Sequence, residues 1–186
     1  LAAALHDDPI ALYDTTTHQN VGELVGHGTW VFALVFADDG QTLISGDEDG
    51  VLRIWDVARR TQRRAVTCDV QINSLAMVPG QDCVAGGCAD GLVRIWNIQT
   101  YALEASWPVH EGPAWGTACS HDGRLLASAG ADGKIVMCDL PARRPLLAWH
   151  AHEGESVSVA FSPDDKRLAS GGDDLTVKLW DVDQLL

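Results

Sequence analysis

The sequence predicts an all-β chain in which one four-stranded antiparallel sheet is copied several times. Three observations predict this fold class. Tryptophan-centred segments recur every 41 to 42 residues, and short apolar segments alternate with turns rich in Gly and Asp. No window carries apolar residues at the 3.6-residue period of an amphipathic helix. We therefore expect almost no helix.

The period is read from three similar segments, "VLRIWDV", "LVRIWNI" and "TVKLWDV", which contain Trp55, Trp96 and Trp180. The step from Trp55 to Trp96 is 41 residues, and two further steps of 42 lead through Cys138 to Trp180. One step backwards from Trp55 leads to Tyr13. The chain therefore divides into a partial repeat and four further repeats, at residues 1–25 and about 26–66, 67–108, 109–150 and 151–186.

A second set of residues keeps fixed distances inside the repeats. In three repeats a His, a Ser, an Asp and the Trp position are separated by 18, 4 and 6 residues. The three sets are His27, Ser45, Asp49 and Trp55; His110, Ser128, Asp132 and Cys138; and His152, Ser170, Asp174 and Trp180. The remaining repeat keeps Asp90 and Trp96 but has Cys68 and Gly86 at the His and Ser positions. Chance does not produce this spacing three times.

Each repeat also has one order of predicted strands, which the first full repeat illustrates. An apolar segment at 30–37 ends in a turn at 38–40, and a short strand follows at 42–46. A tight turn then leads to a β-branched strand that ends near the Trp, at 51–57. The connection at 58–62 leads to a fourth, more polar strand. Four short strands separated by Gly and Asp turns are typical of an antiparallel sheet.

These features resemble WD-repeat sequences. The resemblance rests on the Gly26–His27 pair, on the Trp-Asp pairs at 55–56 and 180–181, and on "FSPDDKRLASGGDDLTVKLWDV" near the end. It covers nearly the whole chain, and several positions match in register. It implies a β-propeller in which each repeat supplies most of one four-stranded blade, with the repeat offset from the blade by its outermost strand.

The resemblance also implies a hydrogen-bonded relay of Trp, Ser, His and Asp inside each blade. The chemistry suits such a relay, because an indole only donates, a hydroxyl and a neutral imidazole donate and accept, and a carboxylate accepts. A buried polar atom left unpaired would cost about 1–3 kcal/mol. The implied relay residues are His27, Ser45, Asp49, Trp55, Asp90, Trp96, His110, Ser128, Asp132, His152, Ser170, Asp174 and Trp180.

Two of the implied relays are incomplete. The third repeat has Cys138 in place of the indole, and the second lacks the His and the hydroxyl. We therefore expect amides in the strands around Trp96 and Cys138 to exchange faster than those around Trp55 and Trp180.

The repeat number predicts an arc of four to five blades. Seven blades are the commonest number in WD-repeat propellers, and seven repeats need more residues than the 186 in this chain. We expect part of a seven-bladed ring; the alternatives are a small closed ring, or two chains that share one ring. Open ends of an arc would expose apolar blade faces, so self-association through them is expected.

Other readings of the polar residues are weaker. Ser, His and Asp together resemble a hydrolase triad, but a catalytic set normally appears once, and this set is copied in register. The cysteines fall on repeat positions and form no pair of CxxC motifs, so no metal site is expected. Turn acids such as Asp47, Glu48 and Asp173 lack the ligand order of a calcium loop, and we interpret them as exposed turn residues. No catalytic residue and no cofactor is expected.

The composition restricts the classes of partner. A formal net charge of -13 argues against nucleic acid and anionic membranes, which are bound mainly through Lys and Arg. The chain has no apolar run of 18 residues, and its first residues lack the basic region of a signal peptide. Five cysteines, an odd number, favour a reducing compartment, so a cytoplasmic location is expected.

Two groups of residues are candidates for binding a partner. WD-repeat propellers often bind partners on the face that carries the loop before the innermost strand and the tight turn. Those positions are Trp30, Gln71, Pro113, Trp115 and Glu155, with Glu48 and Asp173 from the turns. The second group is a basic cluster, Arg59, Arg60, Arg63 and Arg64, which suits an acidic or phosphorylated segment if it is more than rim charge.

The sequence as a whole predicts a non-enzymatic scaffold that binds other proteins or sibling domains of a longer chain. The alternative is a regulatory or sensor propeller attached to a larger, possibly bacterial, kinase or NTPase. A hydrolase is a third and much weaker hypothesis.

Overall fold

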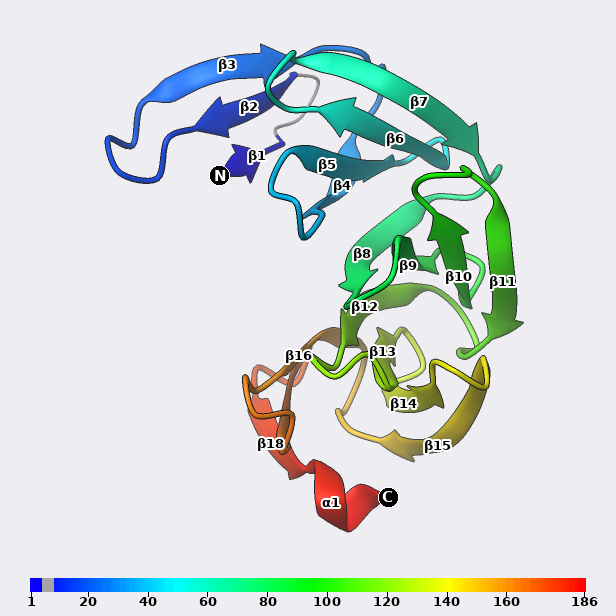
Figure 1. Cartoon of the computed structure of the whole chain (residues 1–186). Coiled ribbons are helices and arrows are strands. Elements are labelled where there is room, and N and C mark those ends of the chain that lie inside the picture. Colours follow the sequence, from blue (N-terminus) through cyan, green and yellow to red (C-terminus); the bar gives the residue numbers. More distant parts are fainter. Residues whose placement is uncertain (5–8) are drawn as a thin grey trace.

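The computed structural model describes residues 1–4 and 9–186, and these residues form five antiparallel sheets that follow one another along the chain. Figure 1 shows the sheets side by side around an open arc, with the two termini in the first and last parts of the arc. The prediction of an all-β arc of propeller blades is confirmed. Below, the sheets are called the first to fifth blades, in chain order.

The first three blades cover residues up to 108. In the described residues the first blade has the strands β1 (Ala2–Ala3), β2 (Ile10–Tyr13) and β3 (Asn20–Leu24). The second blade has β4 (Val31–Phe36), β5 (Thr42–Asp47), β6 (Val51–Asp56) and β7 (Thr61–Thr67). The third has β8 (Ile72–Val78), β9 (Cys83–Cys88), β10 (Leu92–Asn97) and β11 (Leu103–Pro108).

The last two blades differ in strand number. The fourth has β12 (Ala114–Cys119), β13 (Leu125–Gly130), β14 (Lys134–Asp139) and β15 (Arg144–His150). The fifth has three strands among the described residues, β16 (Ser156–Phe161), β17 (Arg167–Gly172) and β18 (Val177–Asp181). A short helix, α1 (Val182–Leu185), follows, and no helix in the described part of the chain is long and apolar enough to span a membrane.

The core of the arc lies between the blades, because each interior sheet is buried on both faces. In β5, Leu43 packs with Trp55 against the first blade, whereas Ile44 packs against Ile72 of the third. All six residues of β5 are consequently buried. The approach is close: a Cβ added to Gly46 would lie 2.5 Å from the Ile72 side chain.

The fifth blade has one open face. Val177 and Leu179 of β18 are 77% and 67% exposed, because no further blade packs against them in the described residues. The β18 strand is also an edge, since β17 is its one neighbour in the sheet.

The repeat extends to the irregularities of the strands. The innermost strand of the second to fifth blades carries one bulge at the same position. A bulge bends and twists a strand and leaves one residue without a ladder partner. The bulged residues are Phe32, Asn73, Trp115 and Val157.

The tight turn between the second and third strands has a glycine at one fixed position in the second to fourth blades, but not in the fifth. Gly50, Gly91 and Gly133 occupy the same turn position with φ of 75°, 77° and 74°, where a glycine avoids the steric cost of a Cβ. In the fifth blade the position belongs to Leu175, with φ of 60°. This turn is therefore strained.

Candidate functional site

The second blade contains a complete relay. The Trp55 indole N–H donates to Ser45 Oγ at 2.8 Å, and Ser45 Oγ lies 2.6 Å from His27 Nε2. His27 Nδ1 lies 2.7 Å from Asp47 Oδ2, and the Val51 amide donates to Asp47 Oδ1 at 2.7 Å. Because a carboxylate only accepts, the contact with Asp47 requires the proton on Nδ1, and Nε2 then accepts the proton of the serine hydroxyl. Arg53 Nε lies 3.2 Å from the same Nδ1.

The carboxylate of this relay corrects the sequence prediction. Asp49 is exposed in the turn, whereas Asp47 is 1% exposed and contacts His27. The reason lies in the space beside the imidazole. At Gly130 and Gly172, which are equivalent to Asp47, an added Cβ would lie 2.3 and 2.4 Å from the ring of that blade's own relay histidine. A side chain at position 47 therefore displaces the imidazole and becomes its partner.

The fifth blade contains the second complete relay. The Trp180 indole donates to Ser170 Oγ at 2.9 Å, and His152 lies 2.8 Å from both Ser170 Oγ and Asp174 Oδ1. The Trp149 ring, from the outer strand of the fourth blade, meets Trp180 edge-on with centroids 5.5 Å apart.

The fourth blade keeps the polar part of the relay without the indole. His110 lies 3.1 Å from Ser128 Oγ and 3.0 Å from Asp132 Oδ1. Cys138 stands at the Trp position, and Trp107 of the preceding blade packs in the same apolar cluster. A neighbouring blade thus supplies an indole beside the position that lacks one.

The third blade has no relay, and its two predicted members have other roles. Asp90 forms two hydrogen bonds with the Arg94 guanidinium, at 2.8 and 2.6 Å, because the blade offers it no imidazole. Trp96 is buried over Gly86, where an added Cβ would lie 2.8 Å from the indole ring. The ring therefore fills the space that a serine side chain would need.

Burial sets the charge state of the relays. It lowers the pKa of His27 and of His110, so both imidazoles are neutral near pH 7. The Thr176 hydroxyl, followed by His152, holds the pKa of Asp174 well below its usual range. The His27, His110 and His152 side chains are 5%, 0% and 0% exposed.

A cavity of about 710 Å³ lies away from the relays, and it is lined by the turns around Ser120, Asp139 and Asp165 and by α1. In the two complete relays the serine hydroxyl already accepts the indole proton. This geometry fits a buried structural role for Ser45 and Ser170.

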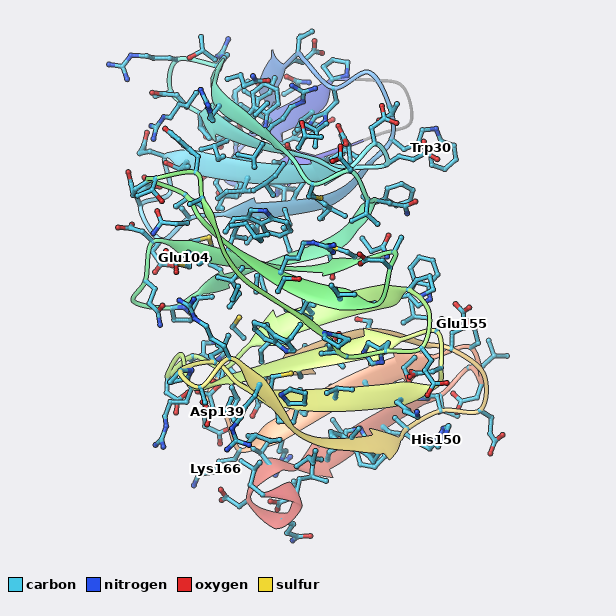
Figure 2. All side chains as sticks on the ribbon, turned by 90° about the vertical axis from the view of Figure 1, so that its right-hand side faces the viewer. Trp30, Glu104, Asp139, His150, Glu155 and Lys166 are labelled. Carbon is cyan, nitrogen blue, oxygen red and sulfur yellow. The ribbon has the colours of Figure 1, made fainter. Side chains whose placement is uncertain are left out.

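The predicted loop and turn residues meet at one edge of the arc. In the second to fifth blades the residue before the innermost strand accepts a backbone hydrogen bond from the tight turn. The pairs are Trp30 with Glu48, Gln71 with Ala89, Pro113 with Ala131, and Glu155 with Asp173. Figure 2 shows Trp30, His150 and Glu155 on this edge. Glu104, Asp139 and Lys166 lie on the opposite edge.

An exposed aromatic pair stands out on this edge. Trp30 and Phe32 are each 44% exposed, and their ring centroids lie 6.1 Å apart. Phe32 is the bulged residue of β4. The sequence reading missed it, since strict alternation along a strand says nothing of a bulge. We call Trp30, Phe32, Glu48, Glu155 and Asp173 the docking face.

The middle of this edge is occupied by contacts between blades. The Gln71 side chain donates to Asn73 at 2.8 Å, and Asn73 donates to the Ala114 carbonyl oxygen of the fourth blade at 3.0 Å. Pro113 and Trp115 are half-buried. Asn73 therefore joins the third and fourth blades and holds the Gln71 side chain. Binding of a partner by Gln71, Pro113 and Trp115 stays a prediction.

The predicted basic cluster is engaged within the chain. Arg59 and Arg63 pair with Asp56 at 2.8 and 3.3 Å, and hydrogen bonds from the Arg59 amide and guanidinium lower the pKa of Asp56 to about 2. Arg64 lies over the Tyr101 ring, 5.7 Å from its centroid.

Arg60 and its equivalent Arg143 connect blades. Arg60 donates to the carbonyl oxygen of Val21 in the first blade. Arg143 donates to the carbonyl oxygen and the carboxylate of Glu104 in the third blade, both at 2.9 Å. Arg60 and Arg143 thus connect their blades to the outer strand of the preceding blade. The Arg59 side chain is 79% exposed, and binding of an acidic partner by the cluster stays a prediction.

Comparison with known proteins agrees with this architecture. The family model "WD domain, G-beta repeat" matches residues 18–56, 62–97, 102–139 and 143–181. The chain belongs to the WD-repeat family.

Two relatives and one solved structure show the range of this likeness. SIR4-interacting protein SIF2 of Saccharomyces cerevisiae is 31% identical over 131 residues, which are 70% of this chain and 24% of the relative. "DENN domain and WD repeat-containing protein SCD1" of Arabidopsis thaliana is 31% identical over 98 residues, 52% of this chain and 8% of the relative. The chain thus spans a quarter or less of both relatives.

The structural likeness extends over nearly the whole chain. A chain in the crystal structure of the Mitotic Checkpoint Complex superposes with a TM-score of 0.87 at 21% identity. The match covers 98% of this WD-repeat chain and 57% of the other chain. At this identity the likeness establishes the fold alone.

Proposed function

We propose that this WD-repeat chain is a non-enzymatic platform that binds another protein on the docking face. The observation that carries the proposal is the exposed pair of Trp30 and Phe32. A Trp anchor surrounded by polar residues is typical of a binding hot spot. The buried relays support the non-enzymatic part, because their hydroxyls and imidazoles are occupied by one another.

The charge of the docking face indicates the chemistry of the partner. Glu48, Glu155 and Asp173 belong to the same edge as the aromatic pair, and the whole chain carries a formal net charge of -13. Complementary potentials favour encounter and register between partners. We infer a protein partner that presents an apolar side chain flanked by Lys or Arg. One relative is named for its interaction with another protein, which supports a protein as the partner.

The full-length protein tests the proposal. Tagged wild type, Trp30→Ala and Phe32→Ala forms are cross-linked to their partners in cells and compared by quantitative mass spectrometry. Loss of a hot-spot aromatic costs about 2 kcal/mol or more, so recovery of the principal partner falls by about tenfold or more. Lys166→Ala, on the opposite edge, is the matched control and keeps the partner. Equal recovery with both aromatic variants, together with loss on Lys166→Ala, contradicts the proposal.

A regulatory domain of a longer protein is the second candidate. The name of one relative joins WD repeats to a DENN domain, so such repeats occur beside another domain. The coding sequence around this segment decides between the two: an adjoining kinase or NTPase domain favours regulation within one chain. For either candidate we propose a reducing, cytoplasmic location, which five free thiols support.

A further inference from the structure

The third blade places two thiols where the second blade has its imidazole–carboxylate pair. Cys68 stands one repeat after His27, and Cys88 stands one repeat after Asp47. In the second blade this pair of positions brings two side-chain atoms to 2.7 Å. In the third blade both cysteines belong to one apolar cluster, where Cys68 Sγ donates to the Val70 carbonyl oxygen at 3.2 Å and Cys88 Sγ lies 3.9 Å from the Gly86 carbonyl oxygen. The two thiols also interact with one another.

Backbone hydrogen bonds hold both cysteines in place. Cys88 ends β9 opposite Ile72, and the Cys68 amide donates to the Gly50 carbonyl oxygen at 2.9 Å. Both side chains belong to the apolar cluster that contains Ile72, in which Cys88 is fully buried and Cys68 half-buried. Cys68 is therefore the thiol that solvent reaches.

The surroundings make the two thiols unequal. The hydrogen bond from Cys88 lowers the pKa of Cys68 to about 7, with a smaller contribution from the Arg94 guanidinium. The same hydrogen bond and burial raise the pKa of Cys88. Arg94 is itself held by Asp90 at 2.8 and 2.6 Å. A half-exposed thiolate with a second thiol beside it is the arrangement found at peroxide-sensitive cysteines.

We propose that Cys68 and Cys88 form a redox-active pair that hydrogen peroxide oxidises to an intramolecular disulfide. The Cys68 thiolate attacks one peroxide oxygen, the O–O bond breaks, and a sulfenic acid and one water form after protonation. The Cys88 sulfur then attacks the Cys68 sulfur, the S–O bond breaks, and the departing hydroxide takes the Cys88 proton to become a second water. Two electrons pass from the thiols to the peroxide. The new bond fastens the loop at 68–71 to β9.

The experiment uses the full chain, purified in its reduced form. The protein is exposed to hydrogen peroxide, which catalase then removes, and is unfolded in excess N-ethylmaleimide, digested and analysed by mass spectrometry. We expect one linked peptide joining Cys68 to Cys88, and a fall in alkylatable thiols from five to three that dithiothreitol reverses. Arg94→Gln, whose charge favours the thiolate, is expected to slow the reaction several-fold.

Matched variants make the result specific. Cys83→Ser alters another buried thiol of β9 and keeps the 68–88 bond. Cys68→Ser and Cys88→Ser each abolish the linked peptide while circular dichroism stays that of the wild type. Wild type that keeps five thiols under conditions that oxidise reduced thioredoxin overturns the proposal, and so does a linked peptide that joins other cysteines. If a variant fails to fold, the linked peptide of the wild type decides alone.

Discussion

At the scale of single residues, one position beside the relay histidine decides which carboxylate the imidazole contacts. A glycine at this position, as at 130 and 172, lets the imidazole approach the aspartate of the tight turn. In the second blade Asp47 occupies the position, and its own carboxylate contacts His27 instead. The sequence could have indicated this exchange, because residues two apart on a strand share a face, as Ser45 and Asp47 do. The equal spacing of the repeats favoured Asp49, because spacing along the sequence does not show that a side chain at position 47 takes the space beside the imidazole.

The first prediction separates these two aspartates. Asp47→Ala leaves the His27 Nδ1 proton and the Val51 amide without an acceptor, so the free energy of unfolding falls by about 1–3 kcal/mol. Asp49→Ala, at an exposed turn position, changes it by about 0.5 kcal/mol or less. Urea unfolding followed by tryptophan fluorescence measures both. An equal loss in the two variants, or a larger one for Asp49→Ala, contradicts the assignment.

The second prediction concerns the relay hydroxyls. Ser45→Ala leaves two buried groups, the Trp55 indole N–H and His27 Nε2, without their hydrogen-bond partner. Ser128→Ala leaves only His110 Nε2 without its partner. At about 1–3 kcal/mol for each unpaired group, Ser45→Ala destabilises the chain more. The same urea titration compares the variants, and a greater loss in Ser128→Ala would show that the indole contact contributes little.

The third prediction is a pH dependence of stability. The pKa values of His27 and His110 lie below 6.5 in the folded chain, so between those values and 6.5 the unfolded chain binds more protons. The contribution of the two neutral imidazoles to the free energy of unfolding is complete above about pH 6.5. It is lost as the pH falls through the pKa values of the folded chain. Urea midpoints at about pH 7.5 and 5.5 measure the fall, and His110→Gln makes it smaller. An unchanged fall in that variant excludes His110 as a contributor.

At the scale of elements, the repeated spacing predicted the strands well and their irregularities poorly. The order of strands follows from apolar segments separated by Gly and Asp turns. The bulges at Phe32 and Trp115 depend on how the innermost strand bends around the axis, a tertiary effect that leaves no periodic signal. Phe32 therefore escaped prediction as a docking residue. The expected order of amide exchange stays a prediction, and for Trp180 the open face of the fifth blade argues against it.

The fourth prediction uses the strained turn. Leu175 has φ of 60° and is 97% exposed, so it bears the cost of a left-handed backbone without burying its side chain. Leu175→Gly relieves that strain and raises the free energy of unfolding by about 1 kcal/mol. Gly133→Ala, at the equivalent turn, is the converse control: its Cβ would meet the Gly154 carbonyl oxygen at 2.6 Å, and stability falls. Thermal unfolding measures both, and a decrease for Leu175→Gly contradicts the strain argument.

At the scale of the whole molecule, the arc places residues from two blades along one edge, which no single repeat reveals. The docking face combines Trp30 and Phe32 from the second blade with Glu155 and Asp173 from the fifth. The sequence placed most of these residues correctly in loops and turns. It could not show that Arg60 contacts the first blade, because that contact joins residues 39 positions apart in the sequence. Self-association through the open ends stays a prediction, supported by the exposed Val177 and Leu179.

The central claim is that the repeated imidazoles are buried and hydrogen-bonded inside the blades. Chemical modification of the histidines tests it most directly. Native protein is treated with diethyl pyrocarbonate near neutral pH, and each site is quantified by mass spectrometry. The account predicts rapid modification of His121, whose side chain is 60% exposed. His27, His110 and His152 are predicted to react only when the chain unfolds, since their side chains are at most 5% exposed. Modification of these three in the folded protein at the rate of His121 would contradict the account.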